Sequence, residues 1–494
     1  MAVRWSPADQ APVDDTALAA LQGVCARVDA AEEDCLAAGI DWWPLSAARA
    51  LGGEVPGRAG VVARPASTAE VSGVIEVCDR WRIPVTASGG RSGVCGGAVP
   101  VFGGVALDLT GLAGIAEVDE RSLLIEVRAG TFGDDLEAAL RDGPGLTLGH
   151  WPQSVSLSTV GGWVACRSAG QYSTRYGKIE DMVVGLEVVL ADGRVVTTGG
   201  RGPRAASGPD LNQLFVGSEG TLGVITAARL RARPAPAHEQ RAAYGFATFD
   251  QGLDACRRIL RRGATPAVLR LYDDAESARS FERPGTHLLL VLDEGDPGLV
   301  AAGMDVVAEE AAGAGGHADD VELVARWLGH RNDTSVLATV VRQGVVADTI
   351  EIAAAWSALP AIYADAVTGL RAVPGTVAAS AHQSHAYGDG ACLYFTFAGL
   401  PAIGDDGGGG AGGAGGPDRY YRQAWDAVMA ATLAHGGAIS HHHGIGLNRA
   451  GYLREALGPA FDVLVSVKQA LDPNGILNPG KLGLPSAFGV TPWP

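Results

Sequence analysis

The chain has 494 residues, of which 47% are hydrophobic and 19% charged, and its formal net charge is −17. This length exceeds what one hydrophobic core usually organises, so we expect two or three domains. The acidic balance argues against broad nucleic-acid binding, which needs clustered Lys and Arg, but it leaves room for a small anionic ligand held by a few local donors.

Cysteines and termini bear on the compartment. The seven cysteines are scattered, odd in number and without CxxC spacing, which favours a reducing cytoplasm and argues against a zinc ribbon. The N-terminus lacks an apolar signal core, and no window approaches ~18 uninterrupted apolar residues. The chain closes on "TPWP" rather than on a peroxisomal Ser-Lys-Leu ending. We therefore expect a soluble, cytoplasmic protein, for which peripheral membrane contact stays open.

Residues 1–55 predict a short helical segment. Within it, "DDTALAALQGVCARV" spaces its apolar residues three and four apart, as on one face of a helix. Residues 59–90 then predict strand, helix and strand, with the second strand leading into a glycine-rich loop. The helix starts at a capping box, in which Ser67 is the N-cap and Glu70 reaches back to it.

Short apolar runs continue to about residue 235. "VVGLEVVLADGRVVTTG" predicts a hairpin with Asp192-Gly193 at the turn. Strands and helices mixed in this way indicate an α+β fold rather than regular βαβ repetition.

The Pro-rich stretch 233–240 predicts a domain boundary, and a second α+β region follows it. The glycine-rich stretch 404–418 cannot pack and predicts a mobile loop. A helix then ends at Gly436-Gly437, and two more helices close the chain, the last stopped by Pro473.

The loop "TASGGRSGVCGG", 86–97, directly follows a predicted strand. Its glycines allow positive φ angles that turn successive N–H groups inward, a nest suited to pyrophosphate oxygens. Tight surface turns use the same residues, and the glycine spacing does not fit the Rossmann fingerprint. The candidate ligand-binding residues here are Gly89, Gly90, Arg91, Ser92 and Gly93.

Two further loops strengthen the case, because each sets glycines beside small hydroxyl residues. The second loop offers Pro152, Ser158, Thr159, Gly161, Gly162 and Ser168. The third offers Gly217, Ser218, Glu219, Gly220 and Gly223 before a strand. One such loop is weak evidence, whereas three in one domain indicate a large bound dinucleotide.

These loops resemble the FAD-binding domain of the vanillyl-alcohol oxidase / p-cresol methylhydroxylase (PCMH) superfamily. Within it, the resemblance is closest to alkyldihydroxyacetonephosphate synthase and its bacterial relatives. The stretches that carry it are "STVGGWVACRSAGQYSTRYGKIEDMVVGLEVV", "GSEGTLGVITAARLRARPAP", "FDQGLDACRRILRRGATPAVLRLYD", "YGDGACLYFTFA" and "ISHHHGIG". They span about residues 60–480.

The resemblance implies a PCMH-type FAD-binding domain over 56–235, an α+β cap or substrate domain over 236–435, and a C-terminal segment over 436–494. FAD would lie extended between the first domain and the cap. Related proteins with covalent flavin commonly carry a histidine in the first loop, and none is present here, so the resemblance implies non-covalent FAD. The cofactor-binding residues it implies are Gly89 to Gly93, Pro152, Ser158, Thr159, Gly161, Gly162, Ser168, Glu219, Gly220, Gly223 and Ile225.

The run His441, His442 and His443 has three interpretations. As a short extended segment it would place His441 and His443 on one face and His442 on the other. Two histidines on one face bind a metal only if a third ligand arrives from elsewhere, and no HExxH spacing accompanies them, so we expect no metal. A packed structural role is the second interpretation. In the resembling synthases the triple-His motif lies in the active site, beside a tyrosine that corresponds to Tyr394.

Tyr394, taken alone, is more often a core aromatic, and the His run is what favours catalysis. A phenol needs adjacent imidazoles or positive charge to act as a base near neutrality. Arg270 matches a family arginine near the active site and is the candidate for an anionic substrate group, with Asp273 as its partner; a surface salt bridge is the alternative.

The sequence departs from the family at several points. Leu337 takes the place of a substrate-binding arginine, and Arg342 is out of register. Thr396 replaces a second aromatic in the tyrosine strand, and the C-terminus looks more like the D-lactate dehydrogenase and glycolate oxidase branch. These departures bear on the substrate.

We expect an FAD-dependent alkyldihydroxyacetonephosphate-synthase-like enzyme, which exchanges an acyl ester for a long-chain alcohol and so acts on a small, lipid-like substrate. The alternative is an FAD-linked oxidase or dehydrogenase of a 2-hydroxy acid or another alcohol. A non-catalytic flavin-binding module is the third hypothesis, against which the intact Tyr-His constellation argues. Members of the resembling family are often homodimers.

Overall fold

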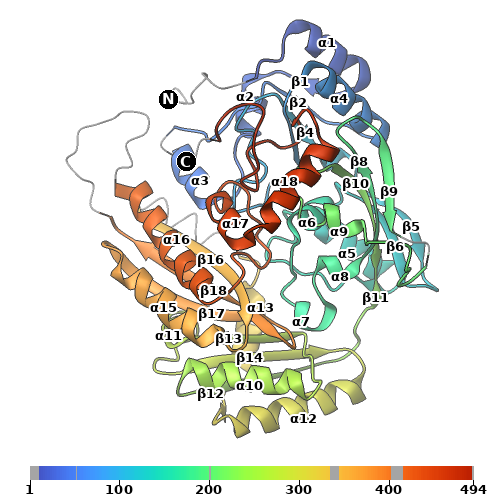
Figure 1. The fold of residues 1–494 in the computed structure, drawn as a ribbon. Helices are drawn as coiled ribbons and strands as arrows, with labels where there is room; N and C mark the ends of the chain where they lie inside the picture. The colour runs from blue at the N-terminus through green and yellow to red at the C-terminus, as the bar shows by residue number, and fades with distance from the viewer. Residues whose placement is uncertain (1–10, 52, 200–201, 334–343, 402–415, 492–494) are drawn as a thin grey trace.

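The computed structural model describes residues 11–51, 53–199, 202–333, 344–401 and 416–491. Two α+β halves are joined by a C-terminal segment, drawn red in Figure 1, which lies between them. Mixed helices and strands confirm the α+β class. Leu337, Arg342 and the glycine-rich stretch up to 415 lie outside the described residues.

The first sheet has the order β1-β2-β4-β3, with β2, β4 and β3 parallel and β1 antiparallel at the edge. The unit β2-α4-β3 confirms the predicted strand, helix and strand. Ser67 caps α4 as predicted, but Glu70 accepts from the backbone N–H groups of Ala66 and Ala26 rather than closing a capping box. The elements are α1 (Asp15–Val24), β1 (Val28–Asp29), α2 (Glu32–Ala37), α3 (Pro44–Leu51), β2 (Val61–Ala63), α4 (Thr68–Trp81), β3 (Val85–Ser88) and β4 (Val105–Asp108).

The second sheet, β5-β6-β10-β8-β9, is antiparallel. Strands β8 and β9 form the predicted hairpin, and Gly193 has the positive φ of +82° that its turn requires. The elements are β5 (Ile115–Asp119), β6 (Leu124–Arg128), α5 (Gly133–Asp142), β7 (Leu146–Thr147), α6 (Val160–Cys166), α7 (Ser173–Tyr176), α8 (Ile179–Met182), β8 (Val183–Val189), β9 (Val195–Gly199), α9 (Asn212–Phe215), β10 (Val224–Arg231) and β11 (Arg233–Pro234).

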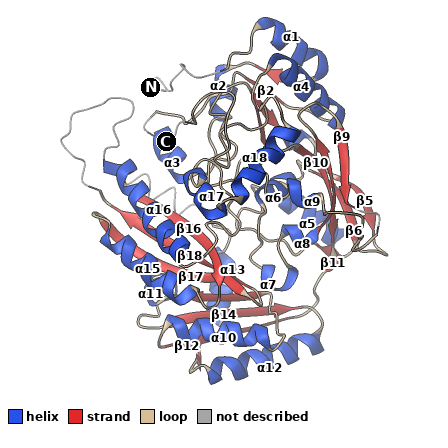
Figure 2. Ribbon diagram, in the orientation of Figure 1, coloured by secondary structure: helices blue, strands red, loops and turns tan. Residues whose placement is uncertain are grey.

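The second half is built on an antiparallel sheet of order β15-β12-β14-β13-β17-β18-β16, with helices packed against it in Figure 2. Its long central strands β17 and β18 pair along most of their length, which brings His382 opposite Tyr394. The elements are β12 (Glu239–Phe246), α10 (Phe249–Arg261), β13 (Val268–Tyr272), α11 (Asp274–Phe281), β14 (His287–Glu294), α12 (Pro297–Gly313), β15 (His317–Ala318), α13 (Glu322–His330), β16 (Val346–Ala355), α15 (Leu359–Ala372), β17 (Thr376–Ala386), β18 (Gly390–Gly399) and α16 (Gly416–Ala434).

The C-terminal segment returns to the first domain. Helices α17 (Ala450–Leu457) and α18 (Ala460–Leu471) are followed by a bridge between Leu477 and Val85 of β3. The buried ammonium of Lys468 on α18 donates to the carbonyl of Thr221 at 2.8 Å, to the carbonyl of Leu477 at 2.8 Å and to the carboxylate of Asp472. Within the described residues, no helix is both long and apolar enough to cross a membrane.

We predict that Lys468→Ala lowers the free energy of unfolding by about 3 kcal/mol, because it leaves the fully buried Asp472 carboxylate without its counter-charge. Urea denaturation followed by fluorescence measures this. Val463→Ala, at a 64% exposed position of the same helix, is the matched control and should change stability by less than ~0.5 kcal/mol. Equal effects of the two substitutions would refute the prediction.

Candidate active site

The first two glycine loops meet directly after β3. A Cβ at Gly89 would lie 2.1 Å from Oγ1 of Thr159, and one at Gly90 would lie 1.9 Å from the carbonyl oxygen of Leu157. Any side chain at these two positions would therefore collide with the second loop. Arg91, between them and Gly93, has a left-handed φ of +53°, as a backbone nest requires.

Hydroxyl groups of the second loop hold its shape. Oγ of Ser158 donates to the carbonyl of Ser154 and accepts from the indole of Trp163 at 2.7 Å. Oγ of Ser168 lies 2.8 Å from Nε2 of His150. Of the other predicted positions, Pro152 lies at the beginning of this loop, and Thr159, Gly161 and Gly162 lie between the two serines, at the start of α6.

The third loop has a role that the sequence does not indicate. The buried Glu219 carboxylate accepts from the backbone N–H groups of Ile445 at 2.6 Å and Gly446 at 2.8 Å, so it is bound to the segment that carries the histidines. Gly220 shares its loop, Gly223 directly precedes β10, and Ile225 is buried within that strand.

The joined loops fit a bound dinucleotide. The amide of Asn478 ties them together by donating to the carbonyls of Gly97 and Glu219. Its Oδ1 and the Oγ of Ser88, at the end of β3, are buried and have no hydrogen-bond partner among the described residues. Buried polar atoms of this kind are normally satisfied, so a polar ligand is the natural partner at the mouth of these loops.

A buried ion pair shapes the histidine segment. Glu351 on β16 and Arg449 have fully buried side chains and lie 2.9 Å apart. The Glu351 carboxylate also accepts from Oγ of Ser440 at 2.8 Å and from the backbone N–H groups of His441 and His443. Burial is the largest single influence and would raise the pKa of Glu351, but the charge of Arg449, the neighbouring His443 and the two backbone N–H bonds together outweigh it, so the pKa is lowered.

The segment bends instead of running extended, so the predicted alternation of the histidines is wrong. His442 and His443 both face Tyr394, whose hydroxyl lies 2.5 Å from Nε2 of His442 and 3.4 Å from Nε2 of His443. Burial raises the pKa of Tyr394 well above its usual value and lowers that of His442 well below. The ground state is thus a neutral phenol beside neutral imidazoles.

Arg270 joins the same cluster through His382, not through Asp273. Its Nε donates to the hydroxyl of Tyr272 at 2.6 Å, and its Nη2 lies 2.7 Å from Nε2 of His382. Asp273 instead caps α11 and accepts from the backbone of Ala381, which corrects the expected partnership. Among the described residues, Tyr272 and His382 are the hydrogen-bond partners of Arg270, and its Nη1–Nη2 edge has the donor geometry that suits an anion.

His382 couples the arginine to the tyrosine. Its ring stacks on that of Tyr394, with centroids 4.8 Å apart and an interplanar angle of 14°. Nδ1 of His382 lies 2.7 Å from the buried carboxylate of Glu276, which also accepts from Thr396. Since guanidinium can only donate, Nε2 of His382 is the acceptor and Nδ1 carries the proton. The structure therefore brings Arg270, Tyr394 and the three histidines together.

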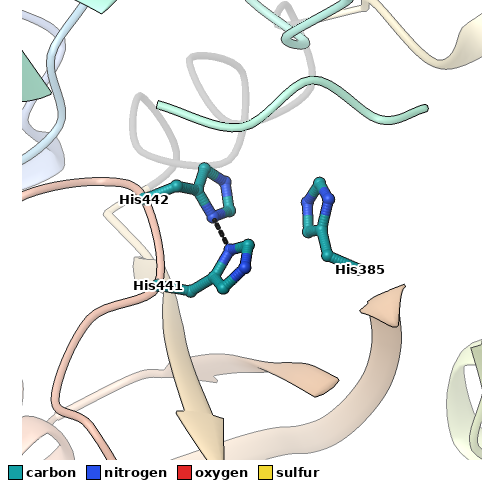
Figure 3. Close-up of side chains that lie close together, drawn as sticks. All are labelled: His385, His441 and His442. Atoms are coloured by element: carbon teal, nitrogen blue, oxygen red, sulfur yellow. Dashed lines mark hydrogen bonds between the residues drawn. The ribbon is translucent and has the colours of Figure 1, made fainter. Parts of the chain in front are cut away.

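The rings of His385 and His442 lie beside that of His441. Figure 3 shows His385, from the end of β17, facing the rings of His441 and His442. Three nitrogens of these rings lie within 4.8 Å of one another, close enough to consider a metal ion. The Nδ1 atoms of His441 and His442, however, are 2.8 Å apart and hydrogen-bonded, closer than the ~3.4 Å expected for two ligands of a tetrahedral zinc. We describe them as a hydrogen-bonded cluster.

Several residues of this site were missed by the sequence analysis, namely Ser173, Glu276, Glu351, His382, His385, Tyr387 and Arg449. A signal exists for some of them: "SAHQSHA" places His382 and His385 among small residues of a strand, and "TIEIAAA" places Glu351 alone among apolar residues. Ser173 and Arg449 have no such signal.

Two families match the chain. The family "FAD linked oxidases, C-terminal domain" matches residues 235–482, and the family "FAD binding domain" matches residues 59–199. The uncharacterized FAD-linked oxidoreductase YgcU of Escherichia coli (strain K12) is 32% identical, over 85% of this chain and 88% of its own length. Alkyldihydroxyacetonephosphate synthase of Dictyostelium discoideum is 27% identical, over 87% and 74%. Glycolate oxidase subunit GlcD of Bacillus subtilis (strain 168) is 29% identical, over 85% and 88%.

Solved structures agree on the fold. An alkyldihydroxyacetonephosphate synthase aligns with a TM-score of 0.78 at 23% identity, covering 97% of this chain and 87% of its own. p-Cresol methylhydroxylase with bound substrate aligns with a TM-score of 0.75 at 16% identity, covering 95% and 96%. The expected superfamily and fold are confirmed, and so is FAD as the cofactor.

The buried histidines make stability depend on pH. Burial lowers the pKa of His443 from 6.5 to about 4, so the folded state binds a proton less readily than the unfolded chain. Its contribution to stability is complete above about pH 6.5 and is lost as the pH falls toward 4. We predict that His443→Gln reduces the slope of unfolding free energy against pH in this window by up to about 1.4 kcal/mol per pH unit.

Urea denaturation at a series of pH values between 4 and 7 measures the slope. His435→Gln is the control, because His435 is a surface histidine paired with Asp365. A His443→Gln variant with the wild-type slope would contradict the prediction.

Proposed function

The chain belongs to the FAD-linked oxidases, within the PCMH-type FAD superfamily, and on this premise we propose that it is an alkyldihydroxyacetonephosphate-synthase-like enzyme. The observation that carries the proposal is the joined cluster of Arg270, Tyr394 and the triple histidine. An anion-binding edge and an acid–base pair lie at its two ends, bridged by His382.

The residues divide the work as follows. Arg270 holds the phosphate of the acylated substrate on its Nη1–Nη2 edge. Tyr394, with His442 and His443 at its hydroxyl, takes up the proton of the incoming alcohol and returns a proton to the departing carboxylate. FAD, when bound, would supply the flavin ring on which the acyl-to-alkyl exchange depends.

FAD would be held by the residues of the three loops. The Gly89 to Gly93 nest would take the pyrophosphate, and the loop from Pro152 to Ser168 would take the rest of the nucleotide backbone. We propose a non-covalent cofactor. In support, Cys166 is a poor nucleophile near neutrality, because burial raises the pKa of its thiol to about 12.

A second candidate is dehydrogenation of a 2-hydroxy acid. A single bidentate guanidinium matches one carboxylate, and glycolate oxidase subunit GlcD is among the relatives. In this case Arg270 would hold the carboxylate and the Tyr394–His442 pair would take the hydroxyl proton. FAD, when bound, would supply the hydride acceptor.

Anaerobic absorbance titration decides between the candidates. If the synthase proposal is right, D-lactate and glycolate leave the oxidised flavin band unchanged, and an acyl-dihydroxyacetone phosphate releases fatty acid when a long-chain alcohol is added. Bleaching by a hydroxy acid, reversed by an electron acceptor, would establish the dehydrogenase and refute the synthase.

The acid–base and anchoring roles are separable by mutation. We predict that Tyr394→Phe lowers kcat at least ~100-fold with unchanged FAD content, because the phenol proton is lost while the ring still stacks on His382. Arg270→Lys should instead raise KM by about 10- to 100-fold, since an ammonium cannot offer a bidentate edge. Steady-state kinetics on whichever substrate turns over measures both. Indistinguishable kinetic effects would argue against this division of roles.

A further inference from the structure

One continuous line of hydrogen bonds leaves Tyr394 and crosses the cluster. From its hydroxyl it runs 2.5 Å to Nε2 of His442, then 2.8 Å between the Nδ1 atoms of His442 and His441. From Nε2 of His441 it continues 3.0 Å to the hydroxyl of Tyr387, 3.0 Å to Oγ of Ser173, and 2.7 Å to Nδ1 of His385.

We propose that these six side chains form a proton wire, in which His441, Tyr387, Ser173 and His385 serve as relay residues for the proton of Tyr394. This inference rests on the proposed acid–base role of Tyr394. It adds Tyr387, Ser173 and His385 to a site whose sequence motif ends at the triple histidine.

Every hydrogen bond of the wire can form in either direction, with the donor and the acceptor exchanged. In one arrangement each group donates to the next: Tyr394 to His442, His442 to His441, His441 to Tyr387, Tyr387 to Ser173, and Ser173 to His385. In the other arrangement every hydrogen bond runs the opposite way, from His385 towards Tyr394. Imidazole and hydroxyl groups allow both, since each carries one donor and one acceptor when neutral.

Protons balance along the wire. When the hydroxyl proton of Tyr394 passes to His442, each inner group gains one proton and gives up one, and His385 gains the last on Nδ1. The result is a Tyr394 phenolate and a His385 imidazolium, with the direction of every hydrogen bond reversed. Return of the proton restores the first arrangement. In an exchange reaction it goes back through Tyr394 to the leaving group.

Burial keeps the wire neutral at rest, because it disfavours both the Tyr394 phenolate and the His385 imidazolium and so drives the proton back. Ser173, His385 and His441 are at most 9% exposed, and burial lowers the pKa values of His385 and His441 well below the usual imidazole value. No salt bridge among the described residues involves His385, His441 or His442, so no carboxylate fixes the tautomer of these rings. Tyr387, His442 and Tyr394 are partly buried.

The backbone around the wire is fixed from outside it. Lys178 donates to the carbonyl of His441 at 2.6 Å, and the Glu351 carboxylate binds the backbone N–H of the same residue. These bonds hold the main chain without using a ring nitrogen. The rings therefore stay in register while their protons remain free to move.

Histidine ¹⁵N NMR of the FAD-loaded protein tests the wire without any substrate. Tyr387→Phe removes one hydroxyl and keeps the ring, so it cuts the wire between His441 and Ser173. We expect the tautomer populations of both His441 and His442 to shift, although His442 does not touch Tyr387, while the surface histidine His435 is unchanged. A shift at His441 alone would overturn the wire.

Kinetics supply the second arm. Tyr387→Phe and Ser173→Ala should each lower kcat at least ~10-fold, leave KM within about two-fold and change the solvent deuterium isotope effect on kcat, as loss of a proton path predicts. Ser173→Thr, which keeps the hydroxyl, should restore most of kcat. The matched control is Tyr244→Phe, a partly buried tyrosine of β12 outside the wire. Wild-type kcat in both cut variants would refute the relay.

The two arms separate the possible failures. If no substrate turns over, the proposed function fails, and the tautomer shifts still decide whether the wire exists. Metal analysis and titration with Zn²⁺ provide one more outcome. A stoichiometric zinc ion on the nitrogens of His385, His441 and His442 would break the line at its centre and overturn the proposal.

Discussion

The buried pair of Glu351 and Arg449 is the constraint on which the site depends. Two opposite charges with no solvent exposure are costly unless their remaining hydrogen-bonding capacity is also satisfied, and here the carboxylate side is satisfied while Nε and Nη2 of Arg449 have no hydrogen-bond partner among the described residues. The carboxylate meets that condition by accepting from Ser440 and from the backbone of His441 and His443. The same bonds that make the ion pair tolerable therefore bend the histidine segment. Removing the Glu351 carboxylate would have two effects at once. The charge of Arg449 would lose its partner, and the histidine segment would lose the hydrogen bonds that hold it.

A second carboxylate holds the other end of that segment from the opposite domain. Glu219 binds the backbone N–H groups of Ile445 and Gly446, which follow shortly after the histidines in the chain. Glu351 comes from the cap sheet and Glu219 from the loop before β10, so the segment is fastened to both halves of the molecule. This explains its position between the two domains in Figure 1. It also places the tyrosine–histidine cluster next to the glycine loops that we propose bind FAD.

The sequence predicted those features of the fold that depend on residues close together in the chain. The strand–helix–strand unit around α4, the hairpin at Asp192-Gly193 and the glycine loops all follow from residues that are neighbours in the chain. The direction in which each histidine of the run faces was not predictable in this way. It depends on Glu351, 90 residues before His441, and on Glu219, 226 residues before Ile445. Ser173 likewise meets His385 across 212 residues, so no local pattern marks it. The partner of Arg270 was misassigned for the same reason, because Asp273 is near in sequence but is used to cap a helix.

The site contains two kinds of histidine, and the placement of carboxylates separates them. His382 lies between Glu276 and Arg270, an acceptor of protons on one side and a fixed donor on the other, so its tautomer is locked. A locked ring cannot pass a proton along, but it can hold Arg270 and Tyr394 at a constant separation. The backbone N–H of His441, and not its ring, binds the Glu351 carboxylate, and among the described residues no salt bridge involves the ring of His441 or of His442. Their ring nitrogens contact hydroxyl and imidazole groups, each of which can donate or accept a hydrogen bond. The surroundings therefore do not fix which nitrogen of each ring carries the proton. One histidine therefore suits substrate positioning and the other two suit proton movement, although all three are buried within the same cluster.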